Sequence, residues 1–210
     1  MDKGTLEEGL IALGLHHDDT VMDRFQSYAT LLKKWGKVYN LTTLLTDEAI
    51  VSHHFLDSAA LVPVFASFPQ AKRVLDVGSG GGLPSIPLAI LRPDLTVHAV
   101  DAVAKKIAFL TQVGIQLKLT NYQAKHTRVE QFQGSYDVIT SRAFASLYDF
   151  VEWTQHLLAP SGVWLAMKAG VPEEEIAQLP STVRVKSIVT LDVPYLNEQR
   201  HVIILEKTAG

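Results

Sequence analysis

The residues best suited to chemistry lie in a glycine-rich stretch, residues 76–87, which reads DVGSGGGLPSIP. Four of its glycines fall within five positions, 78 to 82. Glycine has no Cβ, so a turn of this kind lets the backbone approach a ligand closely. An apolar run before it is typical of a strand and the residues after it of a helix, which places the ligand at the carboxyl end of a sheet. The stretch therefore predicts a small-molecule site.

The spacing within this stretch separates three classes of ligand. A triphosphate-binding loop needs a lysine directly after its glycines, and none is present. The dinucleotide pattern G-x-G-x-x-G meets Leu83 in its third glycine position, which is a poor fit. In the pattern D-x-G-x-G-x-G, Asp76 precedes Gly78, Gly80 and Gly82. A carboxylate there repels a pyrophosphate but suits a ligand with a cationic amine and a sulfonium, such as S-adenosylmethionine.

Two further acids follow predicted strands and are candidates for the same site. Asp101 ends the strand expected over 96–101 and can accept hydrogen bonds from both ribose hydroxyls of a nucleoside. Dinucleotide enzymes share this feature, so it does not discriminate between the two cofactors. Glu130 follows the third strand, where the adenine would lie. A solvated strand end or a loop cap is the alternative for each acid.

The composition limits the function classes. The chain has 210 residues, of which 47% are apolar and 20% charged, and its net charge of −3 counts against a non-specific nucleic-acid binder. It has no cysteine, which excludes thiolate metal sites and a cysteine nucleophile. His53 and His54 lack companion ligands, so no metal is expected. The first residues lack a secretory pattern and the apolar runs are shorter than the roughly 18–20 residues of a membrane span, so we expect a cytoplasmic protein.

The elements that must position these residues change in character near residue 67. Helical periodicity over 18–37 and 46–65, after a short helix over 4–14, predicts an N-terminal helical extension, residues 1–66. Strands alternate with helices over 67–210, which indicates an α/β domain with a mostly parallel sheet covered on both faces. We expect the extension and this domain to pack as one globular unit.

The pattern also places the individual elements. The expected strands cover 73–77, 96–101, 121–126, 136–144 and 162–170, and the expected helices cover 83–92, 104–119 and 147–160. Two final strand-like runs, 183–193 and 201–207, predict an antiparallel hairpin at one edge of the sheet.

Motifs spread over nearly the whole chain resemble one family. They occur in the order KWGKVYNLTT, HHFLDS, DVGSGGGLPSIPLAI, VHAVDAVAKKIAFL, RVEQF, SRAFASL and QRHVIIL. Together they are similar to the bacterial glucose-inhibited division protein B (GidB) family, the 16S ribosomal RNA guanine-N7 methyltransferases also called RsmG. The resemblance implies a Rossmann-like class I S-adenosylmethionine-dependent methyltransferase, a monomer that acts on 16S ribosomal RNA or the small ribosomal subunit.

The resemblance also implies roles for single residues. Gly78, Leu83, Val129, Glu130 and Arg142 would line the cofactor site. Arg142, at the end of the fourth expected strand, would stand close to the methyl donor and the incoming base. Guanine N7 carries no proton, so we expect Arg142 to position the base or the RNA backbone without acting as a general base.

Basic residues in two places are candidates for RNA contacts. Lys33, Lys34 and Lys37 lie beside Trp35 and Tyr39 on a predicted helix, and a solvated helix face is the alternative. The other candidates lie after strand ends on the ligand side or in the connection between the first helices: Lys168, Arg200, His201 and Asn40.

Two other functions remain open on the residues alone. A nicotinamide-dependent oxidoreductase shares the glycine turn and the acid at a strand end, although Asp76 and Leu83 count against it. A non-catalytic RNA-binding module could keep the fold without the activity. Titration with both cofactors separates the first from a methyltransferase, and transfer of labelled methyl groups to RNA separates the second.

Overall fold

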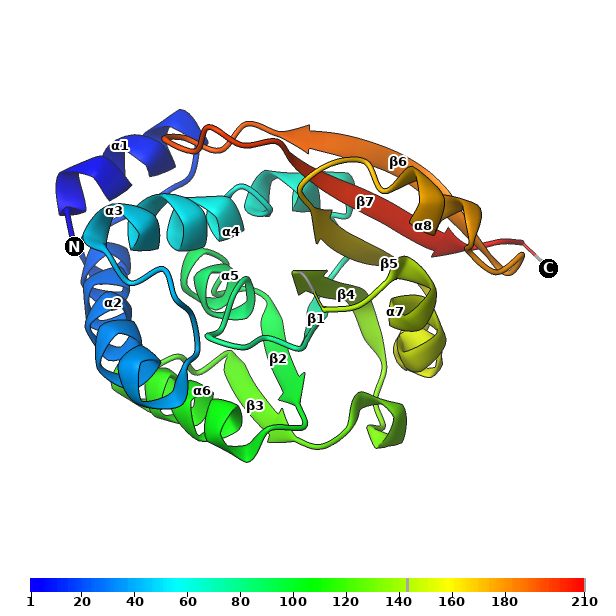
Figure 1. Ribbon diagram of the computed structural model, residues 1–210, viewed down its shortest axis with the longest axis horizontal. Coiled ribbons are helices and arrows are strands. Elements are labelled where there is room, and N and C mark those ends of the chain that lie inside the picture. Colours follow the sequence, from blue (N-terminus) through cyan, green and yellow to red (C-terminus); the bar gives the residue numbers. More distant parts are fainter. Residues whose placement is uncertain (143, 210) are drawn as a thin grey trace.

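A single seven-stranded sheet organises the computed structural model, which describes residues 1–142 and 144–209 (Figure 1). The strand order is β3-β2-β1-β4-β5-β7-β6, and β7 alone runs antiparallel to its neighbours β5 and β6. This arrangement confirms the predicted α/β sheet with an antiparallel edge hairpin. The strands are β1 (Arg73–Val77), β2 (Thr96–Asp101), β3 (Tyr122–His126), β4 (Tyr136–Arg142), β5 (Leu158–Lys168), β6 (Val183–Leu191) and β7 (Arg200–Lys207).

Helices precede the sheet and cover it. Before β1 the helices are α1 (Lys3–Ala12), α2 (Asp19–Tyr39), α3 (Asp47–Ala49), the π-helical segment η1 (Ile50–Leu56), α4 (Asp57–Ala59) and the 3-10 segment η2 (Val62–Ser67). From β1 onward they are α5 (Ser85–Leu91), α6 (Ala104–Gln116), η3 (Val129–Gln131), α7 (Leu147–Thr154), η4 (Gln155–Leu157) and α8 (Glu173–Ala177). Asp2 and Asp18 cap the N-termini of α1 and α2, because their carboxylates accept hydrogen bonds from N–H groups of the first turn.

The two-residue period of the strands divides the core into two layers. Val74 and Val138 point to the face covered by α5, α6 and the helices that precede β1. Leu75, Val77 and Ile139 point to the opposite face, against η3 and α7. Residues that follow one another along β1 therefore lie in different environments, which matters for the site below.

The helix expected over 46–65 forms, but with a wider middle. Its central turns, η1, are π-helical, and its last turns, η2, are 3-10. By length and composition the continuous stretch Asp47–Ser67 would pass as a membrane span, contrary to the expectation that no apolar run is long enough, yet 78% of its most apolar window is buried inside the protein. Its buried polar side chains Ser52, His54 and Asp57 are paired: Ser52 donates to the Glu48 carbonyl, His54 to the Leu44 carbonyl, and Asp57 accepts from Arg142.

Several element boundaries differ from the predictions for local reasons. Helix α6 ends at Gln116 because Lys118 adopts a left-handed backbone, φ 54°. The helix expected over 147–160 ends at Leu157, and β5 begins directly after it. Helix α8 and the single turn η3 were not expected. Residue 143 of the expected strand 136–144 lies outside the described residues.

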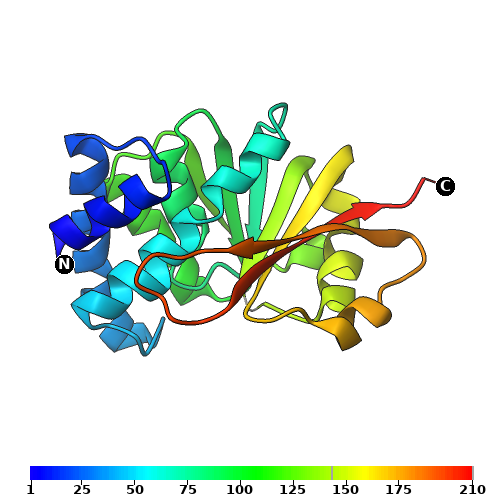
Figure 2. The same cartoon turned by 90° about the horizontal axis from the view of Figure 1, so that it is seen from above.

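The hairpin of β6 and β7 connects the far edge of the sheet to the first helices (Figures 1 and 2). Its turn reaches α1. There the Tyr195 hydroxyl donates to the Glu8 carboxylate at 2.7 Å. In the same turn Glu198 lies 3.3 Å from His53 on η1. The helices before β1 thus contact the hairpin formed by the last two strands of the chain. The division of the chain at residue 66 stays a prediction.

Candidate functional site

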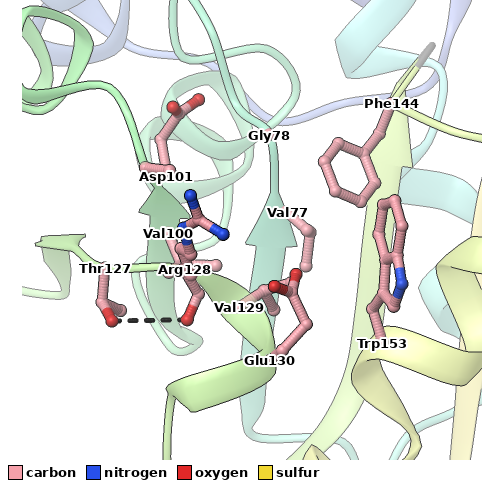
Figure 3. A pocket seen from close by; sticks show the side chains of 11 residues that line it. Val77, Gly78, Val100, Asp101, Thr127, Arg128, Val129, Glu130, Phe144 and Trp153 are labelled. Atoms are coloured by element: carbon pink, nitrogen blue, oxygen red, sulfur yellow. Dashed lines mark hydrogen bonds between the residues drawn. The ribbon is translucent and has the colours of Figure 1, made fainter.

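A pocket of about 300 Å³ opens where β1 and β2 end and the chain turns into η3 (Figure 3). We call it the glycine-turn pocket. Its wall consists of Val77, Gly78, Val100, Asp101, Ala102, Thr127, Arg128, Val129, Glu130, Phe144 and Trp153. Four of the residues predicted for the cofactor site, Gly78, Asp101, Val129 and Glu130, meet here from three different segments of the chain.

Gly78 is required by the shape of this pocket. Its backbone adopts φ 69°, a left-handed conformation that other residues rarely take. A Cβ added there would lie 2.4 Å from Cδ2 of the Phe144 ring. The close approach of Phe144 to the bare backbone therefore depends on the missing side chain.

The two acids of the pocket stand on separate parts of its wall (Figure 3). Asp101 is partly buried, and its Oδ1 accepts a hydrogen bond from the N–H of Val103 at 2.8 Å, which fixes the carboxylate at the start of α6. Glu130 is exposed on η3. Val100, Val129 and the side chain of Arg128 lie between them (Figure 3), so the pocket suits a molecule with a flat apolar part and hydroxyl or amine donors.

Asp76 does not line the pocket, although the sequence pattern placed it with the cofactor residues. It is 0% exposed and lies on the other face of β1 from Val77, because neighbouring side chains in a strand point to opposite sides. Its Oδ2 accepts hydrogen bonds from the Ser79 hydroxyl and, at 3.1 Å, from the Ser85 N–H. Burial raises the pKa of Asp76 to about 7, against those two hydrogen bonds, which lower it. The carboxyl group ties the two ends of the glycine turn together.

The rest of the glycine turn is fixed by contacts on the side away from the pocket. The Tyr28 hydroxyl of α2 donates to the carbonyl of Gly81. Gly82 adopts φ 92°, and a Cβ there would lie 2.6 Å from Ile86 and 3.0 Å from the Tyr28 hydroxyl oxygen. Gly80, Gly82 and Leu83 therefore shape the turn without lining the pocket, and Leu83 is buried in the core.

Arg142 also lies outside the pocket wall, at the end of β4. Its guanidinium group is bound by three acceptors of the π-helical region. Nη1 donates to the His53 carbonyl at 2.8 Å and to Asp57 Oδ2 at 3.0 Å, and Nη2 lies 3.3 Å from His54 Nδ1. Asp57 also binds Arg200 of β7. We call Arg142, Asp57, Arg200 and His54 the arginine cluster.

The other predicted RNA contacts lie in two separate places. Lys168 and His201 face each other in the register of β5 and β7, beside the arginine cluster, and the Lys168 ammonium pairs with Glu175 at 3.1 Å. On α2, Lys33 pairs with Asp47, whereas Lys34 and Lys37 are exposed. Asn40 ends α2 with φ 52° and is exposed.

The sequence reasoning missed two groups of residues. Phe144 and Trp153 close one side of the pocket with their rings edge to face, 5.7 Å apart. The motif SRAFASL contained Phe144, but nothing in the spacing linked it to Trp153 on α7. Asp57 and His54 belong to the HHFLDS motif and were assigned no contact with Arg142, since 85 residues separate Asp57 from it.

Sequence comparison relates the chain to known proteins over almost its full length. The family described as rRNA small subunit methyltransferase G (GidB) matches residues 21–203. Ribosomal RNA small subunit methyltransferase G of Neisseria meningitidis serogroup B is 48% identical over 206 residues, which cover 98% of both chains. The protein of the same name from Ralstonia nicotianae is 50% identical over 214 residues, covering 99% of this chain and 96% of that one.

Solved structures share the fold at low sequence identity. TrmN from Thermus thermophilus matches with a TM-score of 0.57 and 18% identity over 75% of this chain and 53% of that one. TYW2 from P. horikoshii, described in complex with MeSAdo, matches with a TM-score of 0.52 and 15% identity over 67% of this chain and 58% of that one. At such identities these structures show the likeness of the fold alone.

Proposed function

The chain belongs to the family of rRNA small subunit methyltransferase G, and from this premise we propose that it transfers the methyl group of S-adenosylmethionine to N7 of a guanine in 16S ribosomal RNA. The family confirms the resemblance predicted from the motifs, and with it the assignment to the rRNA methyltransferases. The cofactor, the acceptor atom and the residues that act on them form the finer part of the proposal.

The observation that carries the choice of cofactor is the make-up of the glycine-turn pocket. Asp101 offers a fixed carboxylate for the two ribose hydroxyls, and its other oxygen is not engaged by Val103. Val100 and Val129 offer apolar surface for the adenine, and Glu130 an acceptor for its amine. Gly78 lets the backbone come close to the ligand. TYW2, which shares the fold, is described with MeSAdo bound, and this supports the same class of ligand.

The chemical step asks little of the protein beyond positioning. When bound, the cofactor supplies an electrophilic methyl group on a positively charged sulfur. Guanine N7 has a lone pair in the ring plane and no proton to lose, so no general base is needed. Arg142, held at the end of β4, then orients the base or the RNA backbone with its guanidinium group.

RNA must reach the carboxyl edge of the sheet, and the target guanine must leave its stack to do so. Lys168, Arg200 and His201 stand at this edge beside Arg142. The exposed Lys34 and Lys37, with the paired Lys33 and with Asn40, form a second candidate contact at the end of α2. The partner is 16S ribosomal RNA or the small ribosomal subunit.

The first 66 residues act, in this proposal, as a helical extension that braces the methyltransferase domain of residues 67–210. Two contacts support this role: Tyr28 holds the glycine turn, and η1 with Asp57 holds Arg142. We propose that the protein works as a monomer in the cytoplasm.

Two measurements test the function. Calorimetry with S-adenosylhomocysteine and with NAD is expected to show binding of the first and none of the second. Tritium from labelled S-adenosylmethionine is expected to appear as N7-methylguanine in 16S ribosomal RNA, either free or in the small subunit. Binding of the nicotinamide cofactor alone would favour an oxidoreductase, and absence of label on every form of the RNA would favour a non-catalytic module.

A further inference from the structure

The arginine cluster has an unusual ratio of charges for a buried site. Asp57 is 2% exposed, and its carboxylate binds two guanidinium groups at once. Arg200 holds it in a two-point bond, Nε to Oδ1 at 2.6 Å and Nη2 to Oδ2 at 3.0 Å. Arg142 shares Oδ2 at 3.0 Å. One carboxylate for two cations leaves one positive charge uncompensated at the end of β4.

The π-helical segment supplies a further acceptor for Arg142. The N–H of Asp57 donates to a carbonyl five residues back, and the N–H of Ala60 to one four residues back. The Asp57 N–H also donates to the His54 carbonyl, so the hydrogen bonding here departs from the regular α-helical pattern. The His53 carbonyl accepts its bond from Arg142.

His54 completes the set as a neutral acceptor. Its Nε2 lies 3.0 Å from the Leu44 carbonyl, so this nitrogen carries the proton and Nδ1 faces Arg142 with its lone pair. Burial and the charge of Arg142 lower the pKa of His54 to about 4. The cluster therefore gains no third cation from this ring at neutral pH.

These bonds fix Arg142 but engage only some of the N–H groups of its guanidinium. Three of its five N–H groups have partners among the described residues, on Nη1 and Nη2, while its side chain remains 21% exposed. The end of β4 adjoins the end of β1, which carries the glycine turn. A guanidinium held on one side and open on the other suits an anionic or carbonyl oxygen of the incoming RNA.

We propose that Asp57, together with Arg200, is a positioning residue that holds the guanidinium of Arg142 in the orientation needed for methyl transfer. The inference rests on the proposed function and adds a residue to it. Asp57 touches neither the RNA nor the cofactor and acts through Arg142. The wall of the glycine-turn pocket contains no member of the cluster, so we expect cofactor binding to change little when the cluster is disturbed.

The test compares the full-length protein with Asp57→Asn, Arg142→Lys and the double variant. For each, calorimetry gives the Kd of S-adenosylhomocysteine, and labelled transfer to 16S ribosomal RNA gives kcat and KM. We expect Asp57→Asn to lower kcat by about 100-fold, the loss typical of a small displacement at a reacting centre, while the cofactor Kd changes by less than about 3-fold. We expect the double variant to be about as slow as Arg142→Lys alone, because Asp57 acts only through that guanidinium.

Glu206→Gln is the matched control, because Glu206 also binds two cations, Arg184 and Lys186, on the β6–β7 edge away from the site. It should leave kcat and the cofactor Kd unchanged. An unchanged kcat in Asp57→Asn, additive losses in the double variant, or an equal loss of cofactor binding would each overturn the proposal. Should Asp57→Asn not fold, Arg200→Lys decides, since it keeps the charge and loses the two-point bond: a drop in kcat of about 10-fold with normal cofactor binding supports the role, and wild-type kcat overturns it. A wild-type protein that methylates no RNA would instead refute the proposed function.

Discussion

The glycine-turn pocket and the arginine cluster lie at the same edge of the sheet but are built in opposite ways. Most of the pocket is formed by residues at or directly after the ends of β1, β2 and β3, and its acids, Asp101 and Glu130, line the open space. The cluster is formed by helices from the first third of the chain and by β4 and β7, and its carboxylate is fully engaged. The first is arranged to receive a ligand, the second to hold one side chain still.

This difference shows which parts of the chain form a ligand pocket and which parts fix a single side chain. A parallel sheet brings its strand ends together by topology, so a pocket there needs only a glycine turn and a few well-spaced acids. A fixed guanidinium needs acceptors from outside the sheet, and the π-helical turns of η1 provide them. Variants at the two places should therefore fail in different measurements.

The largest effect on the pocket is expected from Gly78→Ala. The substitution forces a Cβ into a left-handed backbone at a cost of roughly 1–2 kcal/mol. It also places that Cβ 2.4 Å from the Phe144 ring, so the turn or the ring must move. We expect the affinity for S-adenosylhomocysteine, measured by calorimetry, to fall by about 100-fold.

Gly80→Ala is the control for Gly78→Ala. Gly80 has a similar backbone, φ 57°, but nothing lies within 4 Å of the added Cβ. It should therefore show the backbone strain without the clash and a clearly smaller loss. Equal losses in the two variants would mean that the approach of Phe144 to the turn is unimportant for the ligand.

Asp101→Asn should weaken cofactor binding next most strongly. Hydrogen bonds to a charged group contribute about 1.5–3 kcal/mol, so the Kd should rise by roughly 10- to 100-fold. At saturating cofactor kcat should be retained, the reverse of the pattern expected for Asp57→Asn. Asp94→Asn, which breaks an exposed pair with Arg92, is the control and should change neither quantity. A lowered kcat at saturating cofactor would contradict the assignment of cofactor binding to the pocket and of methyl transfer to the arginine cluster.

The buried carboxyl group behind the turn predicts a pH dependence of stability. The pKa of Asp76 is raised from 3.8 to about 7 in the folded protein, chiefly by burial. The folded state thus binds a proton that the unfolded state has lost over this range, and the stabilisation from the protonated group disappears as the pH rises through about 7. Asp76→Asn does not titrate, so its Tm relative to the wild type should rise by several degrees from about pH 5 to about pH 8. A constant difference in calorimetric scans would show that Asp76 is ionised throughout.

The smallest effect is expected at the end of α2. Lys34→Ala and Lys37→Ala each remove an exposed charge, so affinity for ribosomal RNA should fall a few-fold and the slope of log K against log salt by about 1 per lysine, if both contact phosphates. Lys118→Ala, on a positive-φ residue after α6, removes a charge elsewhere and serves as the comparison. An unchanged salt slope would identify this part of α2 as a solvated helix face.

The sequence predicted the parallel core of the fold well because its signals are local. The strands β1 and β2 have the expected bounds, since their β-branched runs end at the glycine turn and at Asp101. The ends of α6 and α7 were less predictable, because they depend on the left-handed backbone of Lys118 and on β5 starting early. The helical form of η1 was expected, but not its π-helical turns, which depend on partners far along the chain.

The candidate site was predictable to the extent that its residues follow strands. Gly78, Asp101, Val129 and Glu130 reach one pocket for that reason. Asp76 was assigned to the ligand from its spacing, yet the strand period turns it to the opposite face, toward Ser79 and Ser85. The partners of Arg142 could not be read from the chain, since both Asp57 and Arg200 are distant in sequence and meet it only after folding.

The hydrogen bond from Tyr28 to the carbonyl of Gly81 makes the N-terminal helices important for ligand binding. The loop that would grip the nucleoside is propped by a side chain some fifty positions upstream, and Tyr28 itself stacks on Phe55, 5.0 Å between ring centroids. A fragment that began at the first strand would retain every lining residue and still lose the support beneath its loop. Truncation from the N-terminus should therefore abolish nucleoside binding before it removes any residue that contacts the nucleoside.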